Sequence, residues 1–161
     1  MLKVASFDIV FQEIPGEVTL ALNLSGCPCH CPGCHSPHLW EDIGEILDES
    51  LLEDLVERYK GLITCVAFMG GDQEPLYVVQ LAKYIHYVMS KGEAQLKTAW
   101  YSGRTNFPAE EIFDYVKLGP YVESLGGLKS EKTNQRLYKR VEGKWEDITS
   151  TFWTNRVVTL K

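Results

Sequence analysis

The chain has 161 residues, a usual length for one domain, and 45% of them are apolar, which is enough for a packed core and excludes a disordered chain. Asp and Glu number 22 against 16 Lys and Arg, and the formal net charge of -6 argues against sequence-independent nucleic-acid binding, which needs a basic surface. The apolar runs are too short to cross a membrane, and the N-terminal residues reach an acid at Asp8 without the long apolar stretch of a secretory signal. We expect one cytoplasmic domain over residues 1–161, with no nucleic-acid or membrane partner.

The N-terminal half of the sequence predicts two strands, a long loop and one helix. Apolar and polar residues alternate over 3–12 and again over 18–24, as they do in half-buried strands. Residues 26–38 hold three prolines and two glycines, so no regular helix or strand fits there. Apolar residues then recur at helical spacing over 51–59, after acidic residues and before Gly61.

The second half alternates strands and helices. Residues 62–69 form a short apolar run typical of a buried parallel strand. A helix opened by Pro75 continues to Gly92, and residues 96–101 form another strand. The series ends with two shorter elements, a helix over 108–115 and a strand over 116–118.

This alternation predicts the fold class. Strands that alternate with helices build a parallel sheet with crossover helices. A full eightfold barrel needs roughly 250 residues, so we expect an α/β fold with an incomplete parallel barrel. At the C-terminal end, residues 136–141 and 145–148 flank Glu142-Gly143-Lys144 and predict a β-hairpin extension.

Four of the five cysteines fall within eight residues: Cys27, Cys29, Cys31 and Cys34. An odd number of cysteines, with four crowded into one loop, favours a metal or cluster site over a disulfide scaffold. The spacing Cys27-x3-Cys31-x2-Cys34 provides three thiolates, which can hold three irons of a 4Fe–4S cluster and leave the fourth iron open. Catalytic zinc sites likewise leave one coordination position of the metal free for the substrate. The open iron is therefore expected to bind the substrate. Cys65 lies alone in a predicted buried strand and is expected to be a core residue.

A structural zinc site is the alternative for the same loop. The four cysteines could form a tetrahedral set, with His30, His35 and His38 as substitutes. Zinc modules usually bring ligand pairs from two separate places, whereas every candidate here belongs to one loop. The cluster is therefore the favoured prediction.

The cysteines belong to a longer string from Ser25 to His35, Ser-Gly-Cys-Pro-Cys-His-Cys-Pro-Gly-Cys-His, with Trp40 just beyond it. Its three-cysteine spacing resembles the signature of radical S-adenosylmethionine enzymes, and the fuller string is similar to the activating proteins of anaerobic (class III) ribonucleotide reductases. The likeness covers roughly residues 18–140 and includes three further strings: Gly70-Gly71-Asp72, Tyr101-Ser102-Gly103 and Thr133-Asn134-Gln135-Arg136.

Two positions in the loop depart from the wider radical-enzyme pattern. Many of those enzymes have an aromatic residue just before the third cysteine, where this chain has Gly33. The Pro-Gly pair at this point resembles the reductase-activating branch and so narrows the resemblance. Cys29 is an additional thiol to which the resemblance assigns no role.

The resemblance implies a glycyl-radical-enzyme activase with the incomplete parallel barrel of the radical S-adenosylmethionine type. In such an enzyme a reduced 4Fe–4S cluster, here on Cys27, Cys31 and Cys34, gives one electron to S-adenosylmethionine. The carbon–sulfur bond then breaks to give methionine and a 5′-deoxyadenosyl radical, which removes a hydrogen atom from a glycine of the partner. The implied partners are the catalytic subunit of an anaerobic ribonucleotide reductase and a low-potential electron donor such as a flavodoxin.

The string Gly70-Gly71-Asp72 is the main candidate for binding S-adenosylmethionine. Two glycines allow the backbone to approach a ligand closely, and the Asp72 carboxylate could accept a charge-assisted hydrogen bond from an ammonium group. The resemblance implies that this group is the amino group of S-adenosylmethionine. An ordinary strand-to-helix turn with a capping acid is the alternative.

Weaker candidates lie in two later segments. Arg104, which follows Tyr101 and Ser102 at the end of a strand, could pair with the ligand carboxylate or be a surface residue. Asn134 and Gln135 offer amides suited to a ribose or to a partner's backbone, or they belong to a loop that leads into the hairpin. Two rival functions remain: a radical enzyme for a small molecule, for which the short chain leaves little room, and a zinc-binding interaction module without catalysis.

Overall fold

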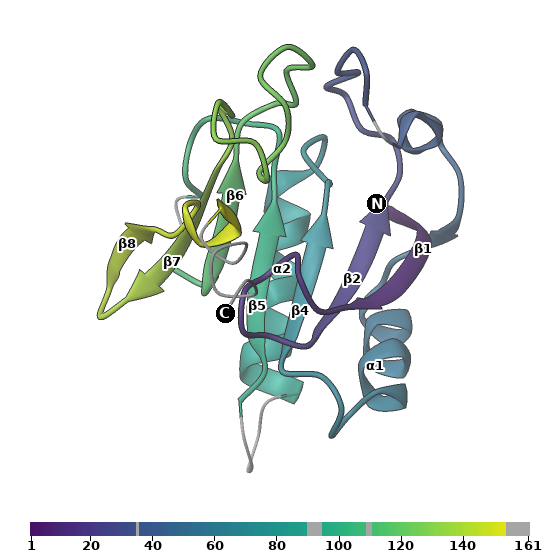
Figure 1. Cartoon of the computed structure of the whole chain (residues 1–161). Helices are drawn as coiled ribbons and strands as arrows, with labels where there is room; N and C mark the ends of the chain where they lie inside the picture. The colour runs from purple at the N-terminus through teal and green to yellow at the C-terminus, as the bar shows by residue number, and fades with distance from the viewer. Residues whose placement is uncertain (35, 90–94, 109–110, 154–161) are drawn as a thin grey trace.

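The computed structural model describes residues 1–34, 36–89, 95–108 and 111–153. Within these residues the strands form one mixed sheet of eight strands in the order β3-β1-β2-β4-β5-β6-β7-β8 (Figure 1). The strands are β1 (Lys3–Val10), β2 (Thr19–Leu24), β3 (Glu45–Ile46), β4 (Cys65–Met69), β5 (Lys97–Tyr101), β6 (Tyr115–Leu118), β7 (Arg136–Val141) and β8 (Lys144–Asp147). The helical elements are η1 (Pro37–Trp40), α1 (Glu49–Arg58), α2 (Pro75–Tyr84) and the π-helical turn η2 (Ile85–Met89).

The four central strands, β2, β4, β5 and β6, run parallel to one another, and the outer pairs are antiparallel. Their register aligns one buried row across the sheet: Leu22, Phe68, Trp100 and Val116. Strands buried on both faces read as nearly continuous apolar runs, which is why the sequence revealed β4 without strict alternation.

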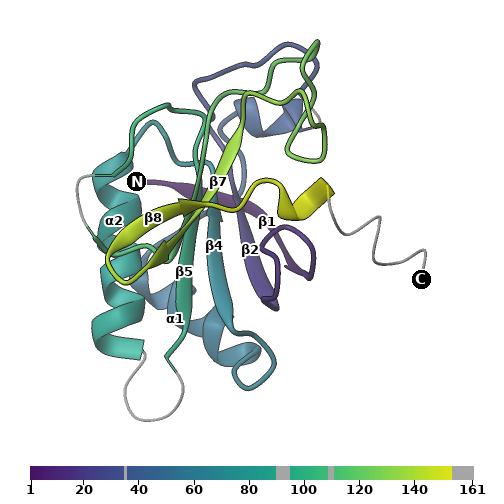
Figure 2. The ribbon, with the colours of Figure 1, turned by 60° about the vertical axis from the view of Figure 1, so that its left-hand side comes forward.

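The sheet has two different faces. Figures 1 and 2 show α1 and α2 together on one face, where their apolar residues join the larger core. The loop 11–18 and the turn at 150–153 lie across the other face. A smaller core there includes Ile14, Cys65 and Tyr115. Cys65 is completely buried, as its place in an apolar run predicted.

The predicted strands are confirmed to within a few residues, and so are the first helix and the C-terminal hairpin. The second helix begins at Pro75 as expected, and its predicted end near Gly92 lies outside the described residues. The strand order is that of an open mixed sheet, and the incomplete barrel remains a prediction. The sequence analysis did not predict β3, which pairs with β1 at one edge of the sheet.

The predicted helix over 108–115 is wrong. Residues 109–110 lie outside the described part of the chain, residues 111–114 form a turn, and β6 begins at Tyr115. Thr98 forms hydrogen bonds with backbone groups that a helix would pair internally. Its hydroxyl donates to the carbonyl of Ile112 at 2.9 Å, and its carbonyl accepts from the amide of Asp114 at 2.8 Å. Bonds to β5 thus replace the local helical bonds.

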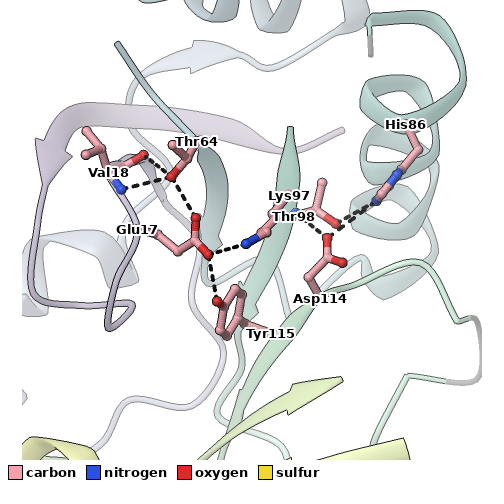
Figure 3. Close-up of polar contacts among 8 residues, drawn as sticks. All are labelled: Glu17, Val18, Thr64, His86, Lys97, Thr98, Asp114 and Tyr115. Carbon is pink, nitrogen blue, oxygen red and sulfur yellow. Dashed lines mark hydrogen bonds and ion pairs between the residues drawn. The ribbon is translucent and has the colours of Figure 1, made fainter. Parts of the chain in front are cut away.

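A buried polar cluster closes the sheet at the amino ends of the parallel strands (Figure 3). Glu17, two residues before β2, is 7% exposed, and its carboxylate accepts hydrogen bonds of 2.7 Å from Thr64, Lys97 and Tyr115. These donors precede or begin β4, β5 and β6, so one carboxylate joins the starts of four strands. Burial alone would raise the pKa of Glu17, but the hydrogen bonds outweigh it and hold that pKa below its usual value.

In the described residues, no helix has the length and apolar character needed to cross a bilayer.

Candidate functional site

The predicted site residues gather in loops at the carboxyl ends of the parallel strands, at the top of Figure 1. The cysteine loop follows β2, Gly70-Gly71-Asp72 follows β4, and residues 102–104 follow β5. The segment that carries Asn134 and Gln135 leads into β7, beside the turn that follows β6. Ligands of open parallel sheets bind at this edge, so these loops form one candidate site.

The cysteine loop is closed at its base by backbone hydrogen bonds. The amide of Gly26 donates to the carbonyl of Glu41 at 3.0 Å, and the amide of Cys27 donates to the carbonyl of Leu39 at 2.9 Å. The ring of His30 stacks on Trp40, with centroids 4.8 Å apart and planes 7° apart. His30 therefore supports the loop through an aromatic contact.

The inner part of the loop has its own turn. The amide of Cys34 donates to the carbonyl of Cys31 at 3.1 Å, and the amide of Ser36 donates to the Cys34 sulfur at 3.4 Å. Of the two other histidines in the zinc alternative, His38 lies in η1, and His35 lies outside the described residues.

Gly33 is the position that departs from the aromatic residue of many radical enzymes. Its φ is +76°, in the left-handed region that favours glycine. A Cβ at this position would lie 1.8 Å from Oε2 of Glu123, so that carboxylate fills the space beside the third cysteine. An aromatic side chain here would displace Glu123.

The four thiols of the loop, on Cys27, Cys29, Cys31 and Cys34, are all partly exposed. Burial, together with smaller contributions from the nearby Cys27 thiol and Asp72 carboxylate, raises the pKa of the Cys29 thiol to about 11. The Cys29 sulfur lies 3.9 Å from Oδ2 of Asp72. The fourth thiol therefore faces the loop after β4.

Asp72 is the best-oriented carboxylate of the site. It is only 3% exposed, and Oδ1 accepts a 2.5 Å hydrogen bond from the Ser102 hydroxyl. Oδ2 accepts a 2.9 Å bond from the backbone N–H of Gly103. Both donors come from the end of β5, so the carboxylate is held in place before any ligand arrives.

The Arg104 side chain also contacts Asp72, mainly at the backbone carbonyl of Asp72. Its Nη2 donates to the Asp72 carbonyl at 2.7 Å, and its Nε lies 4.0 Å from Oδ1. The amide of Arg104 donates to the Ser102 hydroxyl at 3.0 Å. The Arg104 side chain is 51% exposed, so the guanidinium spans from solvent to the buried carboxylate.

The two glycines before Asp72 serve the packing of the sheet. Both have positive φ, +107° for Gly70 and +88° for Gly71. A Cβ on Gly71 would lie 2.7 Å from Cγ2 of Val78 and 3.0 Å from Cδ1 of Leu24. The Gly70 carbonyl accepts a 2.7 Å hydrogen bond from the indole of Trp100. The core explains these glycines without a ligand, although their turn also places Asp72.

Lys117 is a site residue that the sequence analysis missed. It lies in β6 and is 8% exposed, and its Nζ donates to the carbonyl of Gly119 at 3.0 Å. Burial lowers the pKa of the Lys117 ammonium to about 8, while Asp72 and the cysteines of the loop act in the opposite direction. A lysine inside an apolar run that reads as a buried strand is the signal that could have revealed it.

Asn134 and Gln135 both bind the turn after β6. Asn134 Nδ2 donates to the carbonyl of Pro120 at 3.1 Å, and Gln135 Nε2 donates to that of Gly119 at 3.4 Å. The Gly119 carbonyl thus accepts from both Gln135 and Lys117. These amides hold the Lys117 end of the site.

Tyr101 is directed to the second core. Its hydroxyl donates to the carbonyl of Glu13 and its ring packs in the smaller apolar cluster. The Lys117 ammonium lies 5.8 Å from the ring centroid. Tyr101 therefore supports Lys117 from one side while Gln135 anchors its turn.

Residues 15–147 match the family model described as a 4Fe-4S single cluster domain. The chain belongs to this family. Comparisons with curated proteins and with solved structures gave no match. As a 4Fe-4S single cluster domain, the chain is an iron–sulfur protein, and the matched region includes the cysteine loop as well as Asp72 and Lys117.

The residues of the loop fit such a cluster. Within the described part of the chain, no three His, Cys, Asp or Glu side chains converge where a single metal ion could bind. A 4Fe-4S cluster distributes its thiolates over several irons, and the loop offers four cysteines for it. The partly exposed thiols and the buried Lys117 ammonium nearby are suited to a negatively charged cluster with its thiolate ligands.

Proposed function

We propose that this 4Fe-4S single cluster domain is a glycyl-radical-enzyme activase that binds S-adenosylmethionine and generates a radical on a glycine of an anaerobic ribonucleotide reductase. The observation that carries the proposal is the meeting of two loops: a thiol of the cysteine loop lies 3.9 Å from the Asp72 carboxylate. A carboxylate that is already buried and oriented can receive a cationic ligand directly beside a cluster.

In this proposal Cys27, Cys31 and Cys34 hold the cluster and leave one iron for the ligand. When bound, the reduced cluster supplies the electron that breaks the carbon–sulfur bond of S-adenosylmethionine, giving methionine and a 5′-deoxyadenosyl radical. An electron donor of low potential, such as a flavodoxin, would reduce it. The loop's backbone bonds at Gly26 and Cys27 fix where the first ligand stands relative to β2.

The methionyl end of S-adenosylmethionine carries one positive and one negative charge, and the site offers a buried partner for each. Asp72 accepts hydrogen bonds from the ammonium, and Lys117 donates to the carboxylate. Lys117 has three N–H donors, and its bond to Gly119 uses one of them. Arg104 is a positioning residue, because its bond to the Asp72 carbonyl holds the carboxylate-bearing turn.

The partner glycine needs a path to the cluster. An open groove lined by Pro32, Tyr121, Val122, Glu123 and Ser124 runs between the cysteine loop and the loop after β6. An extended segment of the reductase could lie there and bring its glycine to the ligand. The chain would then depend on its partner to cover the site, and would cleave S-adenosylmethionine slowly when alone.

Electron paramagnetic resonance of the anaerobic mixture tests the proposal. The reconstituted protein, S-adenosylmethionine, a chemical reductant and a class III reductase from the same organism are combined. We expect a stable radical on the reductase, absent when its C-terminal glycine is replaced by alanine. The Cys31→Ala protein serves as the cluster-deficient control and should give no radical.

A different result would overturn the proposal. No radical on the reductase, together with rapid turnover of a small metabolite, would support the radical enzyme for a small molecule. A colourless protein that takes up zinc and no iron after anaerobic reconstitution would instead support the interaction module.

A further inference from the structure

Cys29 is the one thiol of the cysteine loop that neither the spacing nor the proposed function uses. Its sulfur points toward Asp72, with 3.9 Å between Sγ and Oδ2. It also lies against the loop after β5, because a Cβ on Gly103 would be only 2.7 Å from this sulfur. The space for the Cys29 thiol therefore exists because residue 103 has no side chain.

The same thiol is close to two of the proposed cluster ligands. Cys27 and Cys31 each stand two residues from Cys29 in the same loop. Cys29 is thus placed between the cluster thiolates and the carboxylate that receives the ligand's ammonium. In the proposed function the open iron receives a ligand that Asp72 binds, so a thiol beside Asp72 would be near enough to compete with that ligand.

The surroundings of Cys29 are not those of a core cysteine. Cys65 is fully buried and packs in the smaller apolar core, among residues such as Ala67 and Ala99. Cys29 belongs to neither apolar core and is partly exposed, with the Asp72 carboxylate as a neighbour. A thiol in such polar surroundings has no packing reason to be a cysteine.

We propose that Cys29 is an exchangeable fourth ligand of the cluster, bound to the open iron when S-adenosylmethionine is absent and displaced when it binds. This inference rests on the proposed function, since it needs an iron that receives a ligand. Binding of Cys29 forms one sulfur–iron bond and releases the thiol proton to solvent. Displacement breaks that bond and returns a proton to the sulfur, so no electron is gained or lost.

The exchange would protect the resting protein. A cluster with four thiolates has no labile iron, whereas one with three loses that iron readily on oxidation. Cys29 would keep the cluster complete until the ligand arrives beside Asp72. The ligand would then take the position that the thiol leaves.

Controlled oxidation of the reconstituted protein tests the fourth ligand. Wild type, Cys29→Ala and the control Cys65→Ala are treated briefly and anaerobically with ferricyanide, without S-adenosylmethionine. Iron is counted and the electron paramagnetic resonance spectrum recorded. Wild type and Cys65→Ala should keep all their iron. Cys29→Ala should lose one iron in four and show the signal of a three-iron cluster.

Alkylation by iodoacetamide tests the displacement. In wild type with its cluster intact, the peptide containing Cys29 should be protected without S-adenosylmethionine and alkylated with it, as read by mass spectrometry. Buried Cys65 should remain unmodified in both conditions and serves as the internal control.

The outcomes separate this inference from the proposed function. Equal loss of iron from wild type and Cys29→Ala would overturn the fourth ligand and leave the activase proposal standing. A Cys29→Ala protein that folds but takes up no iron would make Cys29 a permanent ligand and overturn the exchange. If S-adenosylmethionine leaves the electron paramagnetic resonance spectrum of the cluster unchanged in both wild type and Cys29→Ala, the proposed function is overturned, and the displacement with it.

Discussion

The Ser102 hydroxyl donates a 2.5 Å hydrogen bond to the Asp72 carboxylate and joins the loop after β5 to the loop after β4. The same hydroxyl accepts the amide of Arg104 at 3.0 Å. Ser102 therefore orients the carboxylate and the backbone that follows it with a single oxygen. A ligand that binds Asp72 does not have to order this carboxylate, so less of its binding energy is lost.

This relationship predicts graded losses of affinity for S-adenosylmethionine. Asp72→Ala removes the charge-assisted bond, worth about 1.5–3 kcal/mol, and Ser102→Ala removes one orienting bond, worth about 0.5–1.5 kcal/mol. Titration calorimetry on the reconstituted proteins measures both, with Ser50→Ala, at an exposed position of α1, as the control. Iron content should be unchanged in all of them. Unchanged affinity in Asp72→Ala would remove Asp72 from the site.

Substitution of the individual cysteines predicts which thiols hold the cluster. Cys27→Ala, Cys31→Ala or Cys34→Ala should each abolish it, because each removes one thiolate of the three-cysteine spacing, and Cys29 cannot take the place of that thiolate without a change in the loop geometry. Cys29→Ala should still assemble a cluster. Iron and sulfide analysis after anaerobic reconstitution, with the visible absorption spectrum, provides the measurement. Loss of the cluster in Cys29→Ala with retention in Cys31→Ala would show that the assignment is wrong.

Replacement of Lys117 should separate binding from stability. Lys117→Met should weaken S-adenosylmethionine binding by about 1.5–3 kcal/mol, because a charged donor is lost. The free energy of unfolding should stay the same or rise, because the variant no longer buries a charged ammonium in β6. Calorimetry and urea denaturation measure the two effects, with exposed Lys132→Met as the control. Equal affinity of Lys117→Met and wild type would exclude a contact with the ligand.

The account of Gly71 as a packing residue predicts a loss of stability. In Gly71→Ala, the left-handed backbone should lower the free energy of unfolding by about 1–2 kcal/mol, because the new residue has a Cβ. The contact under 3 Å with Val78 should lower it by about 1–3 kcal/mol more through overpacking. Gly143→Ala is the matched control, because its φ of +79° is similar and nothing lies within 4 Å of its Cβ. Urea denaturation compares the two. Equal loss in both variants would contradict the packing account.

The Glu17 cluster predicts a pH-dependent stability at the end of the sheet opposite the cysteine loop (Figure 3). Glu17→Gln should lower the free energy of unfolding at pH 7 by about 1–3 kcal/mol, since one amide cannot accept from all three donors. The folded-state pKa of Glu17 is lowered, so this stabilisation is present above the unfolded pKa and lost as pH falls through the folded one.

Urea denaturation across the acid range measures this dependence. The difference between wild type and Glu17→Gln should narrow as the pH falls below the usual carboxylate range. Glu146→Gln, on the exposed face of β8, is the control and should match wild type throughout. A difference that stays constant down to acid pH would refute the role of the Glu17 charge.

Much of the fold could be predicted because its signals are local. These signals are the apolar runs of β4 and β5, the proline at the start of α2 and the glycine turn of the hairpin. Each one determines the backbone conformation only of residues close to it in the sequence. The helix predicted over 108–115 failed because Thr98, far along the chain, takes the hydrogen bonds of Ile112 and Asp114. A bond to a distant strand leaves no trace in local periodicity.

The sequence by itself determined the chemistry available at the site: three thiols at a cluster spacing, a fourth between them, and an acid after a buried strand. Only the tertiary structure decided which of these groups meet. Parallel pairing of β2, β4, β5 and β6 brings their carboxyl ends to one edge, so Cys29, Asp72 and Ser102 become neighbours although up to 73 residues separate them. The same pairing buries Lys117 at that edge, because strand register, which no short string of residues encodes, determines what each side chain faces.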